Sequence, residues 1–353
     1  MKSKIISALK IILPLGFGVF LIWLFYDALC EQEKKDLFSA IGKANYSWVL
    51  LALVFSFLSH ASRALRWKYL LDPMGYKIKF WNAYHALMIG YIVNIVFPRA
   101  GEASRAGVLS KTEKVPFQKG FGTILAERAV DVFMLGVVIL IALGMQYNKL
   151  DDFQTKLSDF NSGEAGCGNS LIFSILGKVV TYGILLGFAA IVILFIAKKS
   201  FRRKIIDFVK GMIEGVFAIF KTKHKLKFIG HTLFIWVMYI LMFSVCFYAL
   251  DSTAVLGLDA MLAGFIAGTF SIILVQGGIG VYPAAVGLIV TTYLAPNDPG
   301  ILPDALALGW IIWTSQTILM IILGLISLAL NGKNVKFKHD ESSTPSAENS
   351  SAQ

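Results

Sequence analysis

Long apolar runs separated by shorter charged stretches dominate the pattern of this chain. The runs almost free of charge are Ile11–Tyr26, Trp48–Leu58, Val132–Met145, Gly183–Ala197, Phe228–Leu250 and Ala305–Leu330. A helix of about 20 apolar residues crosses the hydrocarbon core of a bilayer. The runs therefore predict six transmembrane spans, and they exclude a water-soluble globule, a disordered chain and a collagen-like fibre.

The charged residues indicate which loops face the cytoplasm, because Lys and Arg are retained on that side. Residues 198–227 hold ten basic and two acidic residues, a net charge of +8, and are expected inside. Residues 147–170 have a net charge of −2, and the turn 295–304 has two acidic and no basic residues, so both are expected outside. We expect a multi-pass protein of the bacterial inner (cytoplasmic) membrane with both termini in the cytoplasm.

Two apolar stretches do not fit a simple series of crossings. Residues 63–79 and 99–119 are both basic, yet the apolar stretch Phe80–Phe97 lies between them. One crossing would separate the two basic segments, so we expect Phe80–Phe97 to enter the membrane and the chain to return to the same side. Residues 257–295 likewise lie between two outside loops and break at the glycine-rich segment 276–283. This pattern predicts a second re-entrant hairpin, from the outside.

The second half of the chain is then an inverted copy of the first, with halves of about 1–147 and 170–333. Inverted repeats whose broken helices meet near the midplane are typical of transporters. The predicted fold over 1–333 is all-α, a polytopic integral membrane domain with six full spans and two re-entrant helical hairpins. Residues 202–220 predict a cytoplasmic amphipathic helix attracted to anionic lipid headgroups, or a basic topology anchor, and 334–353 predict a disordered cytoplasmic tail.

Composition supports a membrane protein. Of 353 residues, 56% are hydrophobic and 16% are charged, against about 45–50% and about 25% in soluble domains. The net charge of +11 is largely explained by the cytoplasmic loops.

The three cysteines are Cys30, Cys167 and Cys246, and their spacing is not that of a zinc or redox motif. Cys30 and Cys167 share a predicted membrane face. We expect free thiols, with a disulfide between these two as the alternative, since spacing alone does not determine a bridge.

Ionisable residues beside or inside the apolar runs are the main functional signal, because a charge at the bilayer centre costs at least about 2.5–3.5 kcal/mol. Glu127, Arg128 and Asp131 open one run and lie three or four residues apart, on one helix face. Arg128 and Asp131 can pair, which leaves Glu127 to find another cation. Two interpretations stay open: a polar lining in mid-membrane, or a structural ion pair between helices.

A second cluster surrounds the turn of the first hairpin: Asn94, Pro98, Arg99, Gly101, Glu102 and Arg105. Pro98 ends one helix and Gly101 permits the turn. Glu102 falls in the first turn of the next helix, where the free amides form an anion site. Arg99 and Arg105 flank this turn, and a guanidinium binds phosphate through two parallel hydrogen bonds. We expect a lipid phosphate to bind there.

Arg63 and Arg66 lie one turn apart, just before Trp67. We expect snorkelling arginines beside an interfacial tryptophan, with a substrate role as the alternative. The glycine-rich segment Gly277–Pro283 is expected to form the tip of the opposing hairpin. It lacks the Lys-Ser/Thr of a phosphate loop, so nucleotide binding is rejected.

Together these motifs resemble the lysylphosphatidylglycerol synthase transmembrane-domain family, also called the flippase-like membrane domain family, over about Leu9–Leu330. The matching residues are Arg63-x-x-Arg66-Trp67, Asn94-x-x-x-Pro98-x-x-Gly101-Glu102-x-x-Arg105, Glu127-Arg128-x-x-Asp131, and Gly277-Gly278-x-Gly280 with Pro283. In some members a cytosolic C-terminal domain attaches lysine to phosphatidylglycerol, and the membrane domain flips the product. This chain ends in a short polar tail, so the resemblance implies a stand-alone member without the synthase domain.

We therefore expect a lipid translocase that moves a phospholipid or a lipid-linked headgroup across the membrane. Its expected partners are membrane phospholipid, anionic headgroups at the cytoplasmic face and a lipid-modifying enzyme. No cofactor, metal or nucleic acid is expected, and the lack of a nucleophile–base arrangement argues against an enzyme. The candidate substrate-binding residues are Arg63, Arg66, Asn94, Arg99, Gly101, Glu102, Arg105, Glu127, Arg128, Asp131, Gly277, Gly278, Gly280 and Pro283.

Two alternative functions stay open. The first is a non-transporting membrane subunit that docks a lipid-modifying or glycosyl-transferring enzyme. The second is an ion-coupled transporter of a small solute, in which Glu127 and Asp131 form the proton or cation site.

Overall fold

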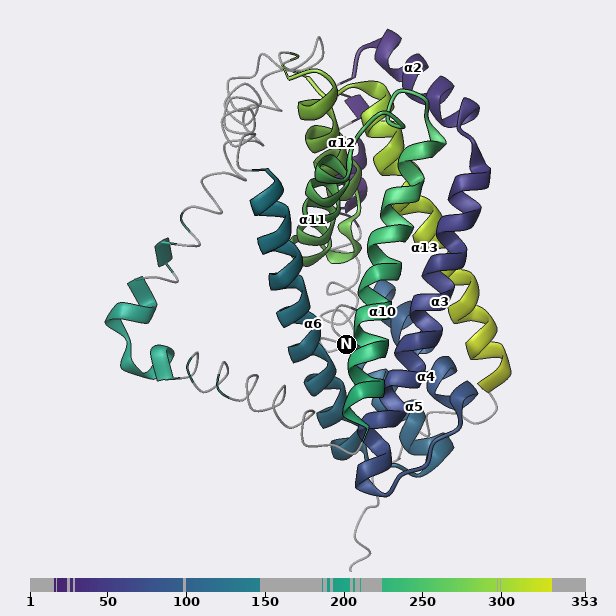
Figure 1. The fold of residues 1–353 in the computed structure, drawn as a ribbon, viewed down its shortest axis with the longest axis vertical. Coiled ribbons are helices and arrows are strands. Elements are labelled where there is room, and N and C mark those ends of the chain that lie inside the picture. Colours follow the sequence, from purple (N-terminus) through teal and green to yellow (C-terminus); the bar gives the residue numbers. More distant parts are fainter. Residues whose placement is uncertain are drawn as a thin grey trace, which may run out of the picture.

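The structure is a computed structural model, shown in Figure 1. It describes residues 16, 18–23, 26–27, 29–97, 100–146, 186, 189–190, 193–203, 206, 210, 224–296, 298 and 300–331. Across these ranges every regular element is helical. Half of the predicted span Ile11–Tyr26, seven of the 15 residues of Gly183–Ala197, most of the amphipathic segment 202–220 and the whole tail 334–353 lie outside the described residues.

Within the described residues, four helices are long and apolar enough to cross a membrane. They are α3 (Tyr46–Leu71), α6 (Phe117–Met145), α10 (Lys225–Ser244) and α13 (Pro303–Asn331). Short 3₁₀ turns extend α3 and α10, as η1 (Asp72–Met74) and η3 (Val245–Ala249). The four helices correspond to four of the six predicted spans.

Two of these helices are much longer than their apolar runs. Helix α3 continues past Leu58 through Arg63 and Arg66, and α6 begins before Glu127. The charged residues do not end either helix, because their side chains pair with one another inside the bundle. An apolar run in the sequence ends at a charged residue, whereas the backbone hydrogen bonds of a helix continue through it.

Shorter helices pair into two hairpins. Helix α4 (Phe80–Val96) packs against α5 (Gly101–Glu113), and α11 (Leu258–Leu274) packs against α12 (Val281–Leu294). A helix of 17 residues, the length of α4 and of α11, spans about 25 Å, less than the roughly 30 Å of a hydrocarbon core. Figure 1 shows the first hairpin in the lower half of the bundle and the second in the upper half.

The second hairpin turns within the glycine-rich segment that the sequence singles out. Gly277, Gly278 and Gly280 have φ angles of 67°, 69° and 76°, in the left-handed region that favours glycine. The turn includes a 3₁₀ segment, η4 (Gln276–Gly278). Trp313 Nε1 of α13 donates a hydrogen bond to the Gly277 carbonyl at 2.7 Å, which ties the tip to a long helix.

A helix that the sequence did not predict, α2 (Glu31–Lys43), lies at the upper end and packs against α13. Because α2 is mainly polar, a search of the sequence for long apolar runs does not detect it. The Glu33 carboxylate accepts a hydrogen bond from the Cys30 backbone N–H at 2.8 Å, which caps its first turn.

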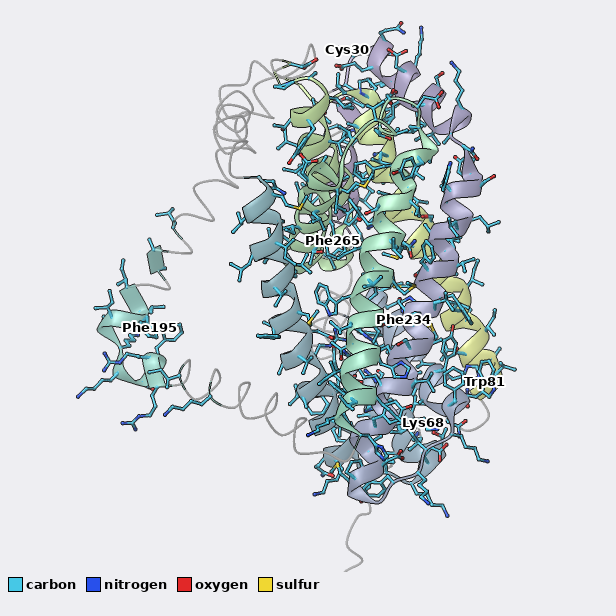
Figure 2. All side chains as sticks on the ribbon, in the orientation of Figure 1. Cys30, Lys68, Trp81, Phe195, Phe234 and Phe265 are labelled. Carbon is cyan, nitrogen blue, oxygen red and sulfur yellow. The ribbon has the colours of Figure 1, made fainter. Side chains whose placement is uncertain are left out.

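The expectation of free thiols is wrong for Cys30, which is held in a disulfide. Cys246 is free and buried, as expected. Cys167 lies outside the described residues. Figure 2 shows Cys30 at the upper end of the bundle, while Lys68 and Trp81 lie towards the lower end.

Candidate functional site

A network of arginines and carboxylates joins α3, α5 and α6 in the lower half of the bundle. Its members are Arg63, Arg66, Arg105 and Arg128 with Glu102, Glu127 and Asp131. Residues three or four apart lie on one face of a helix. The sequence predicts from this spacing that the two arginines of α3 share one face and that the two carboxylates of α6 share another. In the structure these two faces lie against each other.

Asp131 of α6 is held by both arginines of α3. Its carboxylate accepts hydrogen bonds from Arg63 Nη2 at 2.8 Å and from Arg66 Nη1 at 2.9 Å. Arg63 also donates to the Tyr91 hydroxyl of α4 at 3.0 Å, and Arg66 donates to Thr232 Oγ1 of α10 at 3.3 Å. Asp131 and its two arginines thus link α6, α3, α4 and α10 through charge-assisted bonds, which are about twice as strong as neutral ones.

Glu127 is held by Arg105 of α5. Arg105 Nη1 donates to Glu127 Oε2 at 2.7 Å, and Arg66 Nε lies 3.8 Å from Glu127 Oε1. The Arg105 guanidinium also lies over the Trp67 ring, 3.8 Å from its centroid. Trp67 is itself fixed, since its Nε1 donates to Thr123 Oγ1 at 2.9 Å. The prediction that Glu127 finds another cation is confirmed.

Arg128 is the most loosely held member. Its Nε lies 3.7 Å from Glu102 Oε1, and its Nη1 lies 3.9 Å from Asp131 Oδ2. The predicted Arg128–Asp131 pair is therefore only a long contact, because the arginines of α3 occupy the Asp131 carboxylate at shorter range. The side chains of Arg128 and Glu102 are 40% and 28% exposed, so this part of the network meets water.

The interpretation of Arg63 and Arg66 as snorkelling residues is wrong. Arg63 is 5% exposed, and Arg66 and Trp67 are fully buried. Carboxylates of α6 neutralise the two arginines inside the bundle, so the side chains need not reach the interface. A buried charge that loses its partner is costly, which explains why the residues occur together.

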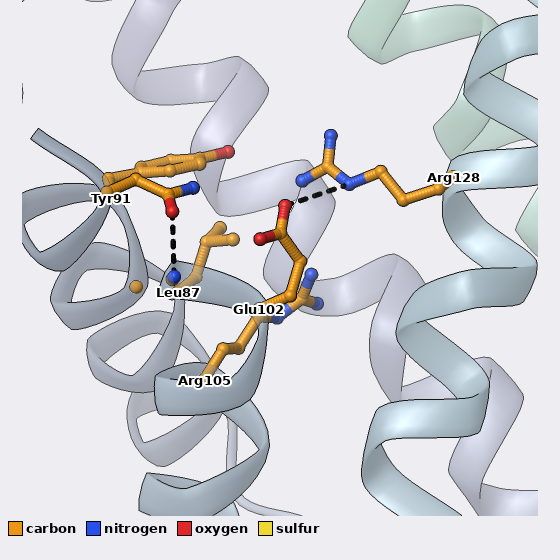
Figure 3. Close-up of a pocket in the computed structure, with 8 residues that line it drawn as sticks. Leu87, Tyr91, Glu102, Arg105 and Arg128 are labelled. Atoms are coloured by element: carbon orange, nitrogen blue, oxygen red, sulfur yellow. Dashed lines mark hydrogen bonds and ion pairs between the residues drawn. The ribbon is translucent and has the colours of Figure 1, made fainter. Parts of the chain in front are cut away.

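A small pocket lies between the first hairpin and α6 (Figure 3). It is lined by Leu87, Gly90, Tyr91, Asn94, Gly101, Glu102, Arg105 and Arg128. Its volume is about 10 Å³, which is room for about one water molecule. In Figure 3 the Glu102 carboxylate points towards Arg128 across this pocket. At this volume the pocket does not hold a phosphate group, so a phosphate could bind there only after lining side chains such as Glu102 or Arg128 move.

A close approach of the two hairpin helices forms the floor of the pocket. The Gly101 backbone N–H donates to Asn94 Oδ1 at 2.7 Å. A Cβ atom at Gly101 would overlap the Gly90 carbonyl oxygen of α4, and one at Gly90 would lie 2.9 Å from the Gly101 oxygen. Glycine is needed at both positions, as the sequence indicates for Gly101 alone.

The structure brings together nine of the fourteen predicted site residues. The nine are Arg63, Arg66, Asn94, Gly101, Glu102, Arg105, Glu127, Arg128 and Asp131. Arg99 lies outside the described residues, as does Pro98 beside it. Gly277, Gly278, Gly280 and Pro283 lie in the second hairpin.

The tip of the second hairpin makes packing contacts of its own. A Cβ atom at Gly280 would lie 3.1 Å from the Leu21 side chain, and one at Gly309 would lie 2.6 Å from the Pro283 oxygen. These contacts and the Trp313 bond position the hairpin against α13 and the first apolar run. They assign the glycines a structural role at the tip.

Besides Gly90, two tyrosines that contact Arg63, Tyr91 and Tyr239, are not among the residues predicted from the sequence. Tyr91 bonds Arg63 and lines the pocket, and it lies one turn before Asn94 on α4, a spacing that could have indicated it. The Arg63 guanidinium lies over the Tyr239 ring of α10, and Arg63 Cζ is 5.7 Å from the centroid of that ring. No local pattern distinguishes Tyr239 from the other aromatic residues of its helix.

The charges of the network favour an anionic guest. Four arginines and three carboxylates leave one positive charge in excess among the described residues. Glu127 and Asp131 are both neutralised by arginines, so they are poor ligands for an added cation. This arrangement does not favour the ion-coupled transporter.

Comparison with known proteins places this geometry in a family. A profile described as the lysylphosphatidylglycerol synthase TM region matches residues 11–332. A UPF0104 membrane protein of Methanocaldococcus jannaschii is 29% identical over 147 residues, which cover 41% of this chain and 42% of that protein. The glycosyltransferase AglD of Haloferax volcanii is 32% identical over 135 residues, 37% of this chain and 22% of that protein.

A UPF0104 membrane protein of Methanothermobacter thermautotrophicus is 27% identical over 119 residues, 32% of this chain and 35% of that protein. The chain thus matches less than half the length of each of these relatives, and no solved structure matches it. The family profile, by contrast, covers most of the chain. This multi-pass membrane protein therefore belongs to the lysylphosphatidylglycerol synthase transmembrane-region family.

Proposed function

We propose that this protein is a lipid translocase, which moves a phosphate-bearing lipid headgroup between the leaflets of the cytoplasmic membrane. The observation that carries the proposal is the arginine–carboxylate network, buried among apolar helices and carrying one excess positive charge beside a pocket. Charges at membrane depth are costly and mark the paths of polar substrates. A polar headgroup that crosses the bilayer needs polar or charged side chains along its path, because the hydrocarbon core does not solvate it.

The proposed topology is six full spans and two re-entrant hairpins related as an inverted repeat. Supporting it, the two helical hairpins lie at opposite ends of the bundle, and α4 and α11 are too short to cross. Non-helical turns at membrane depth are tolerated where protein or a water-filled cavity covers them. The Gly101 and Gly277–Gly280 turns are covered in this way, by Asn94 and by α13.

The proposed orientation puts the lower end in the cytoplasm, with both termini on that side. Lys68, in the last turn of α3, lies at this end (Figure 2), and Lys77 follows in the loop between η1 and α4. The disulfide of Cys30 at the upper end also supports it, because disulfides persist in oxidising compartments. The relatives reported above come from archaea, so the proposal is the cytoplasmic membrane of a prokaryote, the expected bacterial inner membrane being one case.

Cysteine labelling tests the re-entrant hairpins, in a background without the native cysteines. Lys77→Cys and Lys119→Cys flank the first hairpin, and Val255→Cys and Pro296→Cys flank the second; all four positions are exposed. In intact cells a membrane-impermeant maleimide is expected to label the second pair only, and after permeabilisation all four. Labelling of the two members of either pair from opposite sides would contradict re-entry.

Reconstitution tests the translocase itself. Liposomes with a fluorescent lipid in both leaflets are treated with dithionite, which bleaches the outer leaflet only. We expect the protein to make the inner-leaflet signal accessible for lipids with an anionic headgroup. Bleaching that stops at the level of protein-free liposomes, for every anionic and aminoacylated lipid supplied, would refute the proposal.

A second function is favoured by one comparison. The relative named a glycosyltransferase matches over 22% of its length, so a segment similar to this chain is part of a larger protein with that name. This supports a membrane subunit that docks a glycosyl-transferring enzyme. In that case a transferase is expected to co-purify with the chain, and its recovery is expected to be unchanged by Glu102→Ala, a change at a side chain that is 28% exposed.

A further inference from the structure

Within the part of the chain that the structure describes, two buried arginines, Arg66 and Arg105, have a guanidinium edge that makes no hydrogen bond. Nε of Arg66 still lies 3.8 Å from Glu127 Oε1. Arg105 is 2% exposed, and it is bonded to Glu127 through Nη1 alone, which leaves its Nε and Nη2 without a hydrogen-bond partner among the described residues. Nε and Nη2 form one edge of the guanidinium, and that edge can donate two parallel bonds to a single phosphate or carboxylate. Buried donors are nearly always satisfied, so this pair of donors beside the pocket is a candidate binding site for a polar ligand.

The orientation of this edge is fixed before any ligand arrives. Stacking on Trp67 sets the plane of the Arg105 guanidinium, and the bond to Glu127 sets its rotation in that plane. Arg105 also lines the pocket of the first hairpin. A donor pair held in this way loses little side-chain entropy on binding.

The pocket is lined by the most exposed ion pair of the described network, that of Glu102 and Arg128. Glu102 lies 3.7 Å from Arg128, beyond hydrogen-bond distance, and both side chains reach water. Glu102 also follows directly after the Gly101 turn on α5. Its carboxylate can therefore leave Arg128 without loss of a hydrogen bond and without entering an apolar region.

We propose that the Arg105 Nε/Nη2 edge and Arg128 form a seat for a phosphate group bearing one negative charge, and that Glu102 is a gate that occupies Arg128 until the phosphate displaces it. The excess charge of the network agrees with this ligand, because one phosphodiester anion neutralises one positive charge. The inference rests on the proposed function, since it takes the pocket as the place where the lipid headgroup binds.

Binding by the purified protein in neutral detergent tests the seat. The probes are dihexanoyl phosphatidylglycerol and inorganic phosphate, each titrated by calorimetry. Glu102→Gln removes the competing charge and is expected to bind the short lipid about tenfold more tightly, while Arg105→Lys keeps the charge, loses the two-bonded edge and is expected to bind it about tenfold more weakly.

The matched control is Glu113→Gln, which removes the same charge from the other end of α5. Glu113 accepts bonds from the Lys79 backbone and Asn82, away from the pocket. Its lipid affinity is expected to equal that of the wild-type protein. Equal gains from Glu102→Gln and Glu113→Gln would indicate a general charge effect and overturn the gate. Because buried Arg105→Lys can impair folding, the change at the partly exposed Glu102, Glu102→Gln, is the deciding variant.

The two probes separate the sources of the phosphate. Tight binding of the short lipid alone supports a lipid headgroup as the ligand, whereas equal binding of both probes supports a seat for free phosphate. Binding of neither probe, or no gain in Glu102→Gln, overturns the seat. Binding without leaflet exchange in liposomes would refute the translocase and leave the seat in place.

Discussion

Replacement of Asp131 by asparagine is expected to lower the free energy of unfolding by about 3–5 kcal/mol, the cost of breaking a buried ion pair. The carboxylate accepts bonds from both Arg63 and Arg66, which are 5% and 0% exposed. Without it, two guanidinium groups stay buried with one carboxylate too few. The thermal unfolding midpoint of the purified variant in detergent measures the effect.

Asp251→Asn is the matched control for this change. Asp251 is exposed in the loop after η3, and its replacement by asparagine removes the same charge as Asp131→Asn does. We expect its stability to lie within about 0.5 kcal/mol of the wild-type value, as for most surface changes. If Asp131→Asn were as stable as this control, the network would not hold α3 and α6 together.

Gly101→Ala is expected to separate the two helices of the first hairpin. The new methyl group would overlap the Gly90 carbonyl oxygen and approach the Asn94 amide to 2.5 Å. The Gly90 oxygen belongs to the backbone and the Asn94 amide is hydrogen-bonded to Gly101, so moving either of them away costs free energy. Overpacking of this kind costs about 1–3 kcal/mol, sometimes more. The same unfolding midpoint, with the yield of monodisperse protein, reports it.

Gly107→Ala provides the control on the same helix. A Cβ atom at Gly107 meets no atom within 4 Å. The exchange is expected to stabilise α5 by up to about 1 kcal/mol, since alanine is a better helix former than glycine. Opposite signs for the two exchanges support close packing at Gly101, whereas equal effects would contradict it.

The hairpins were predictable because their signals are local. Basic segments on both sides of Phe80–Phe97 point to a return, and glycines at 277–280 permit a turn. The structure has paired helices at both places. The full lengths of α3 and α6 were not predictable, because Arg63 and Asp131 neutralise each other across 68 residues of sequence. A hydropathy pattern does not show that a charged residue is neutralised by a residue far away in the sequence.

The site was predicted as separate motifs rather than as one network. Spacing on single helices correctly grouped Arg63 with Arg66 and Glu127 with Asp131. It could not show that the first pair faces the second, so Arg63 and Arg66 were interpreted as interfacial. Helix α2 was missed for a different reason, since its stability comes from capping at Glu33 and packing on α13 rather than from a long apolar run.

The rate of leaflet exchange in proteoliposomes tests the central claim most directly. Wild-type protein and Arg105→Gln are compared at equal incorporation, with a fluorescent phosphatidylglycerol and dithionite bleaching. Loss of a charge-assisted bond is worth about 1.5–3 kcal/mol, so we predict exchange roughly tenfold or more slower in the variant. Wild-type exchange no faster than in protein-free liposomes, or an Arg105→Gln rate equal to the wild-type rate, would contradict the account.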